Sequence, residues 1–286
     1  MSRPIVLSVF FFILFPYCHA SDGEVRGIIA EAEAAYRAGI YDNCLKLYDE
    51  AIGAESQPNQ IYYNAACCAA LSGKENTALD YLAYIAANDY KDVDFIKADS
   101  DLAVLHSDPH WNDIIKQVEL NLKDYLDRIN IELYNMFKED QRLRNLPEDS
   151  VDWNVVADTD RKHRERTMQI LADHGLKHPD DYFHAALIFQ HGTNSSDYRM
   201  AHELAKSGLT LDPDHSGLRW MFAVTKDRWL WSVGKAQIYG TQSTIRDGRW
   251  TLEPLDTLAV TDEDRAALGL PSLEYYMNRV EALNGK

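Results

Sequence analysis

The spacing of apolar residues predicts α-helices along nearly the whole chain. From Ile115 to Leu143 apolar side chains recur every three or four residues, which is the spacing of one face of an amphipathic helix. We therefore predict one long helix over these residues. Residues 180–192 are apolar nearly all round, so we expect a helix that is buried on every side. The pattern as a whole predicts an all-α protein.

An internal repeat lies in the first third of the chain. Residues 35–52 align with residues 69–86 at an offset of 34, so that Gly39 falls on Gly73. A 34-residue period, with a glycine between two helices, resembles the tetratricopeptide repeat (TPR). The resemblance implies a concave face that binds a protein or peptide. A passive spacer or a dimerisation element is the alternative.

The segment after the repeat predicts where the array ends. Residues 89–115 contain an Asp-Pro turn before a last helix and resemble the segment that closes many short bacterial arrays of this kind. We therefore predict a TPR-like array with its cap over residues 24–118. A long helix then joins it to a second helical domain over residues 119–286.

The first twenty residues have the layout of a signal peptide. An early Arg3 is followed by an apolar run from Ile5 to Phe15, then by Pro16 and by Ala20 before a polar stretch. The run is shorter than the roughly 20 residues that span a bilayer. We expect cleavage after residue 20 and export to the periplasm or the outside, with no integral membrane segment in the mature chain. Retention as an N-terminal anchor is the alternative.

Charge and cysteine content narrow the functional classes. The 286 residues carry a formal net charge of −16, which excludes nucleic acid as a partner because no basic cluster offsets it. Cys44, Cys67 and Cys68 remain after cleavage, and this odd number is no disulfide framework. We expect three small buried hydrophobic side chains and no disulfide. A link from Cys44 to one of the other two is the alternative.

Acidic residues interrupt several apolar stripes of the second domain. Asp140 occupies a position in the apolar seam of the long helix, and Arg144, one turn later, is its nearest candidate partner. Asp227 lies on one helical stripe with Trp220 and Trp231. A carboxylate at such a position is costly to bury unless it is paired, so both acids are expected to have partners.

A third acid and two histidines also lie on helix faces that we expect to be buried. In a helix predicted over 153–174, Asp160 shares a stripe with Arg164, Met168 and Leu171. The next helix places His184 and His191 on one face, seven residues apart. Helical bundles build interior sites from inward carboxylates and imidazoles.

These residues admit three interpretations. The first is that they form a buried network that fixes helix packing. The second is a binding or acid–base site. The third is a divalent metal site with His184, His191 and Asp227 as candidate ligands. The polar loop at residues 235–242 follows Asp227 in the sequence. It either orients a ligand or forms a tight connection whose side chains cap helix ends.

A set of motifs supports a site in this domain. They are ELYNMFKEDQRLRN (132–145), HAALIFQH (184–191), DR (227–228) and Q-x-YGTQ (237–242). Together they resemble a bacterial family of helical domains of unknown function over about residues 125–280. The resemblance implies a candidate pocket formed by Asp140, Gln141, Arg144, Asp160, His184, Gln190, His191, Asp227, Arg228, Gln237, Tyr239, Gly240, Thr241 and Gln242. It supplies no reaction.

The sequence therefore predicts an exported interaction protein of the cell envelope, whose array binds a protein or peptide and whose second domain holds a ligand pocket. The alternative is a hydrolase-like or lyase-like enzyme. Asp227 or His191 would then act as acid or base, and Arg228 with the YGTQ loop would bind an anionic or carbonyl group. A ligand sensor without turnover is a third interpretation. No residue is assigned as catalytic.

Overall fold

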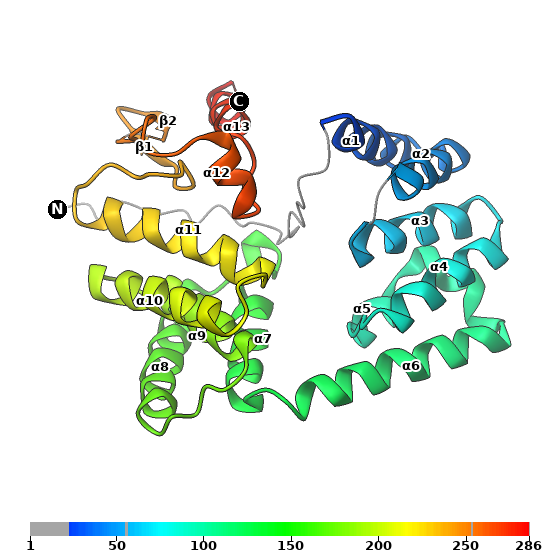
Figure 1. The fold of residues 1–286 in the computed structure, drawn as a ribbon, viewed down its shortest axis with the longest axis horizontal. Helices are drawn as coiled ribbons and strands as arrows, with labels where there is room; N and C mark the ends of the chain where they lie inside the picture. The colour runs from blue at the N-terminus through cyan, green and yellow to red at the C-terminus, as the bar shows by residue number, and fades with distance from the viewer. Residues whose placement is uncertain (1–22, 55–56, 253, 286) are drawn as a thin grey trace. The chain divides into compact units, whose positions relative to one another are not determined.

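The computed structural model describes residues 23–54, 57–252 and 254–285, and these residues are mostly helical (Figure 1). The all-α prediction is confirmed, with one small two-stranded hairpin as the exception. The predicted signal peptide lies outside the described residues. Within the described ranges no helix combines the length and the apolar character needed to cross a membrane.

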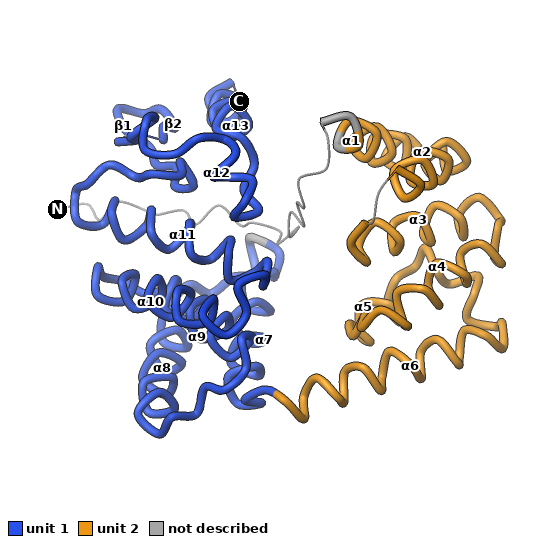
Figure 2. The backbone as a smooth tube through the Cα atoms, in the orientation of Figure 1, with its two compact units in different colours: residues 1–19, 129–286 blue, residues 20–128 orange. Residues whose placement is uncertain are grey.

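The described chain divides into an N-terminal unit that ends at Arg128 and a C-terminal unit that begins at Ile129 (Figure 2). The predicted boundary lay ten residues earlier because we predicted a continuous helix from Ile115 to Leu143. That helix is interrupted. The side chain of Asn130 accepts hydrogen bonds from the N–H groups of Glu132 and Leu133 and starts a new helix there.

The N-terminal unit is a series of short helix pairs. Its elements are α1 (Gly23–Arg37), α2 (Tyr41–Ala54), α3 (Asn59–Leu71), α4 (Glu75–Ala87), α5 (Val93–Ala98), the 3₁₀ helix η1 (Ser100–Ser107) and α6 (Pro109–Leu126). Each of the first three helices packs against the next one in the chain. The apolar core runs through all of these elements and is centred on α3.

The two halves of the sequence repeat have the same turn. Gly39 has φ 72° and Gly73 has φ 77°, a left-handed conformation that glycine adopts without strain. Beside them Ile40 N–H donates to Ala35 O at 2.9 Å, and Lys74 N–H donates to the equivalent carbonyl, 34 residues later, at 2.8 Å. The 34-residue period is therefore present in the backbone as well as in the sequence.

Helix α3 has no open apolar face among the described residues, because α2, α4 and η1 all pack against it. The closing segment is tied to the array by Tyr63 Oη, which donates to Asp99 at 2.7 Å, and by Tyr36 Oη, which donates to Asp101 at 2.5 Å. The segment predicted to cap the array thus covers part of the face that α3 would offer a partner.

One expectation about the cysteines is wrong. Cys44 of α2 and Cys68 of α3 form a disulfide, with their Cα atoms 5.9 Å apart, and only Cys67 is a free, buried thiol among the described cysteines. Small residues are needed where α2 and α3 approach most closely, and both helices supply a cysteine at that contact. The pairing therefore follows from helix packing, which the spacing of cysteines in the sequence does not reveal.

The C-terminal unit contains the remaining elements. They are α7 (Ile131–Arg144), the 3₁₀ helix η2 (Glu148–Ser150), α8 (Trp153–Ala172), α9 (Pro179–Gln190), α10 (Ser195–Leu211), α11 (Ser216–Ser232), β1 (Thr244–Arg246), β2 (Arg249–Thr251), α12 (Asp262–Ala267) and α13 (Leu273–Asn284). Helix α9 lies at the centre and contacts α7, α8, α10 and α11. This confirms that residues 180–192 contain a helix buried on every side.

The predicted stripe of α8 is displaced by part of a turn. Its buried residues are Val156, Asp160, His163, Thr167 and Ile170. Met168, which we placed on the same stripe as Asp160, is exposed. Steps of three and four both fit a helical period of 3.6, so the sequence admitted two neighbouring stripes and burial selected the other one.

The hairpin was not predicted, although its turn has a sequence signature. Asp247 and Gly248 have φ values of 52° and 77°, as a two-residue turn between antiparallel strands requires. Trp250 N–H of β2 donates to the side chain of Asn284 in α13 at 2.7 Å, which fastens the hairpin to the last helix. Strands of three residues are too short for an alternation of apolar and polar residues to identify them.

Candidate functional site

The candidate site is built around the carboxyl end of α9. Arg228 of α11 donates to Gln190 O at 2.8 Å, and Arg164 of α8 donates to His191 O at 3.2 Å. Both guanidinium groups satisfy carbonyls that have no partner within the helix, and their charge is favourable at this end of the helix dipole. The end of α9 is therefore held from two sides, which fixes the backbone at His191.

A charged network of four side chains lies beside this helix end. Asp140 accepts hydrogen bonds from Arg144 at 2.6 Å and from Gln141 at 2.7 Å. Arg144 also donates to Asp160 of α8 at 2.6 Å and so joins two carboxylates. The predicted pair of Asp140 with Arg144 is confirmed, and the pair is part of a larger network that includes Asp160.

His191 completes the network. Its Nδ1 lies 2.9 Å from Asp140 Oδ1, and the two residues are 51 positions apart in the sequence. Burial acts to raise the pKa of the Asp140 carboxyl, but His191, Arg144 and Gln141 outweigh it and hold this pKa below its usual value. Asp140 is therefore an ionised carboxylate at neutral pH. As the acceptor of the Nδ1 proton it favours the imidazole tautomer that leaves Nε2 unprotonated.

The imidazole of His191 is more exposed than the carboxylate it contacts. The side chain of His191 is 18% exposed and that of Asp140 only 2%. Within the described part of the chain, His191 Nε2 makes no hydrogen bond, whereas Nδ1 is fixed by Asp140. An unprotonated nitrogen on a partly exposed ring that is held by a carboxylate can accept a proton or contact a ligand.

Two buried acceptors near this network lack a donor among the described residues. They are Asp160 Oδ1 and Gln190 Oε1. A buried polar atom without a partner costs free energy, so such atoms are rare in packed interiors unless a water or a ligand reaches them. Both belong to residues of the predicted pocket.

Asp227 has a different role from the one we predicted. Its carboxylate accepts hydrogen bonds from Ile238 N–H at 2.7 Å, Tyr239 N–H at 3.0 Å and Thr241 N–H at 3.0 Å, and from Thr241 Oγ1 at 2.9 Å. The YGTQ loop therefore folds back onto α11. However, the carboxylate points into this loop and contacts neither His184 nor His191.

The loop is a tight connection within the C-terminal unit. Gln237 is buried, and its side chain donates to Gln242 O at 2.8 Å and to Leu252 O, and accepts from Gln242 N–H at 2.9 Å. Gly240 has φ 73°, and a Cβ there would lie 3.1 Å from Leu273 Cδ1. Of the two interpretations of this loop, the structure supports the tight connection.

Arg265 is the buried cation that sequence reasoning did not place in the site. Its side chain donates to Tyr239 O at 3.2 Å and to Asp262 at 3.2 Å, and it is among the largest fully buried side chains. It thus holds the YGTQ loop from the side opposite Asp227. A lone arginine in a short polar helix gives no periodic signal, so the apolar pattern did not identify it.

The three candidate metal ligands do not come together. His184 stacks on Phe137, with ring centroids 4.6 Å apart, whereas His191 contacts Asp140 and Asp227 holds the loop. His184 and His191 share a helix face in the sequence, but seven residues separate them by about two turns, or roughly 10 Å along the axis. A metal site made of His184, His191 and Asp227 is therefore excluded by the geometry.

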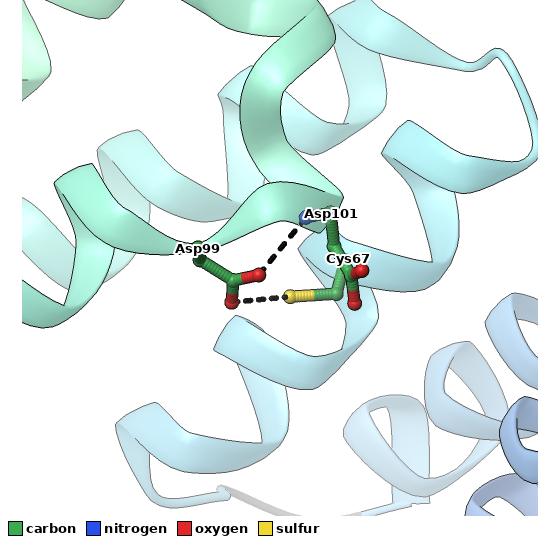
Figure 3. A group of neighbouring side chains, drawn as sticks. All are labelled: Cys67, Asp99 and Asp101. Carbon is green, nitrogen blue, oxygen red and sulfur yellow. Dashed lines mark hydrogen bonds between the residues drawn. The ribbon is translucent and has the colours of Figure 1, made fainter.

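The N-terminal unit contains a different group of possible metal ligands. Cys67 Sγ, Asp99 and Asp101 each offer an atom within 4.8 Å of the others, and they form the only such group of three among the described residues (Figure 3). Their atoms already take part in hydrogen bonds, because the Cys67 thiol and the Tyr63 hydroxyl both donate to Asp99. Burial and the two carboxylates raise the pKa of the Cys67 thiol, so the sulfur stays protonated.

A groove of about 420 Å³ lies on the surface of the C-terminal unit, between α8 and the start of α10. Its lining residues are Arg161, Arg164, Glu165, Met168, Phe189, Thr193, Asn194, Ser196, Asp197 and Met200. None of the fourteen predicted pocket residues lines it. The predicted residues instead form two interior networks, one around Asp140 and one around Asp227, with His184 apart from both.

The fold and the site define a mostly helical protein of two units, in which a packed ionic network at the end of α9 presents one histidine to solvent. Residues 130–286 match the family of unknown function DUF6624, and the chain belongs to this family. No curated protein and no solved structure matches the chain.

Proposed function

We propose that the protein is an exported interaction protein of the cell envelope, periplasmic or extracellular. On this proposal the helix pairs of the N-terminal unit bind a protein or peptide, and the C-terminal unit holds a small ligand at His191. The layout of residues 1–20 supports export. The observation that carries the ligand site is the partly exposed imidazole of His191, held by the buried carboxylate of Asp140.

The N-terminal unit supports the interaction role through its repeated turns and its charge. Residues 23–128 contain 19 acidic and nine basic side chains, a formal net charge of −10. A basic peptide or protein segment is the complementary partner, because opposite potentials steer association. Since η1 covers part of α3, we place the partner surface on the α1–α2 pair, where Ile40 is 56% exposed and Tyr36 is 39% exposed.

A photo-crosslinking residue at position 40 is expected to capture a protein partner in cells that export the protein. Leu120 of α6, which is 45% exposed, is the matched control position in the same unit. We expect an adduct of defined mass at position 40 and none at position 120, and basic competitor peptides should reduce it. The same adducts at both positions would contradict a partner surface on the α1–α2 pair.

A second candidate function is acid–base catalysis at His191, in a hydrolase-like or lyase-like reaction. The specific observation is the contact of Nδ1 with the Asp140 carboxylate, which leaves Nε2 as the free base. Asp140 orients the ring and stabilises the imidazolium that forms when Nε2 takes a proton. Arg164 and Arg228 act through the backbone carbonyls they bind and position His191 rather than contact a substrate.

Hydrolysis of p-nitrophenyl acetate is a direct probe of this second candidate. We expect His191→Gln to lower the protein-dependent rate by at least about 100-fold, since general-base catalysis contributes factors of this size. Asp227→Asn is the matched control: it weakens the loop and lowers stability, and should leave the rate per folded molecule unchanged. Equal rates for the wild type and His191→Gln would rule out His191 as the base.

A further inference from the structure

The helices α9 and α11 both begin with a histidine as their N-cap residue. His178 Nδ1 accepts a hydrogen bond from Asp180 N–H at 3.2 Å at the start of α9. His215 Nδ1 accepts from Leu218 N–H at 3.1 Å at the start of α11. An N-cap is normally Ser, Thr, Asp or Asn, whose oxygen stays an acceptor at every pH near neutrality. An imidazole nitrogen accepts a hydrogen bond only while it is unprotonated.

Both caps share one carboxylate. Asp180 Oδ1 lies 2.8 Å from His215 Nε2, and Asp180 Oδ2 lies 3.5 Å from His178 Nδ1. Each ring therefore contacts a backbone N–H and a carboxylate. The backbone N–H can donate only to the neutral ring, whereas the carboxylate attracts the charged ring. The side chains of His178 and His215 are 28% and 18% exposed, so protons from solvent can reach them.

We propose that His178, His215 and Asp180 form an acid-sensitive latch at the amino ends of α9 and α11. When a ring takes up a proton, its Nδ1 gains a hydrogen and then faces a backbone N–H, so two donors oppose each other and the cap is lost. The new positive charge also meets the positive end of the helix dipole. The proton comes from solvent and remains on the imidazole. The charged His215 ring keeps its contact with Asp180 through Nε2, and the charged His178 ring faces Asp180 Oδ2, which lies 3.5 Å from its Nδ1.

Asp180 remains charged throughout the range in which histidines titrate. Burial acts to raise the pKa of its carboxyl, but His215, with His184 and His178, lowers this pKa to about 2. The carboxylate is thus a constant partner while an imidazole gains its proton. Asp181, on the same turn, is held by the N–H groups of Asn130, Lys177 and His178.

Several other groups surround the latch. They are His184 of α9, Tyr134 of α7 beside it, Lys177 before α9, and Asp212, Asp214 and Arg219 around the start of α11. Arg219 pairs with Asp214, and His184 is buried. The latch lies at the opposite end of α9 from His191, so its release loosens the first turn of the helix that carries the candidate site. The proposal stands without any function for His191.

Asparagine provides the test, because it is among the best N-cap residues and does not titrate. In the full-length wild type we expect the backbone amide resonances of Asp180 and Leu218 to shift between about pH 7.5 and 5. The amide of Ser196, which Asn194 caps at the start of α10, is the internal control. In His178→Asn/His215→Asn the first two amides should stay as constant as that of Ser196. Wild-type shifts no larger than that of Ser196 would overturn the latch.

Two further measurements use the same pH range. The fall in Tm between about pH 7.5 and 5 should be smaller in the double variant than in the wild type, or smaller in His215→Asn alone if the double variant does not fold. Asp180→Asn should move the midpoint of the Leu218 titration to lower pH by about one unit, since the imidazolium loses its counter-ion. An unchanged fall in Tm, or an unmoved midpoint, would contradict the proposed latch.

Discussion

Replacement of Asp140 by alanine is expected to lower the free energy of unfolding by about 3–5 kcal/mol, because it leaves a charged and nearly buried Arg144 with one carboxylate fewer. Asp140 receives hydrogen bonds from Arg144, Gln141 and His191, so the change removes three contacts at once. Urea unfolding at neutral pH, followed by circular dichroism, measures the loss.

The control for this prediction replaces the whole ionic group. In Asp140→Leu/Arg144→Met/Asp160→Leu no carboxylate or guanidinium of the group remains without its partner. We expect this triple variant to cost less than Asp140→Ala alone, as buried ion networks often do when apolar residues of similar volume replace them. Losses that simply add across the three single variants would show that the side chains do not act as one network.

Acidification from about pH 6.5 to 4 is expected to cost about 3 kcal/mol of stability through His184 alone. Burial among Phe137, Tyr134 and Phe183 lowers the pKa of its imidazole from 6.5 to about 4 in the folded protein. Between these two values the unfolded chain binds the proton and the folded protein does not. The stabilisation is therefore complete above about 6.5 and is lost as the pH falls toward 4.

His184→Phe keeps an aromatic ring against Phe137 and removes the titration. Urea unfolding at several pH values should show a smaller loss of stability with acid for this variant than for the wild type. His110→Asn is the control, because His110 is exposed on the N-terminal unit and its contribution to the slope should be small. A slope that is the same in the wild type and in His184→Phe would show that buried His184 is not the proton acceptor.

Much of the local structure was predictable because it depends on spacing within single helices. The apolar pattern predicted a helical protein and the burial of α9, and the 34-residue period predicted the two equivalent turns at Gly39 and Gly73. The pair of Asp140 and Arg144 was predictable for the same reason, since residues four apart lie on one face of a helix. The sequence also identified six of the twelve polar residues that the described part of the C-terminal unit buries.

The partners of those residues were decided by the tertiary structure. Asp140 meets His191 across 51 residues, and Asp227 faces the YGTQ loop, because the packing of α7, α9 and α11 sets which ends approach one another. The break before α7 followed from the Asn130 cap, and the Cys44–Cys68 disulfide from the contact of α2 with α3. A helical period tells which side of a helix is buried. Hydrogen bonds act over about 3 Å and depend on direction, so only the assembled helices determine which group each buried side chain meets.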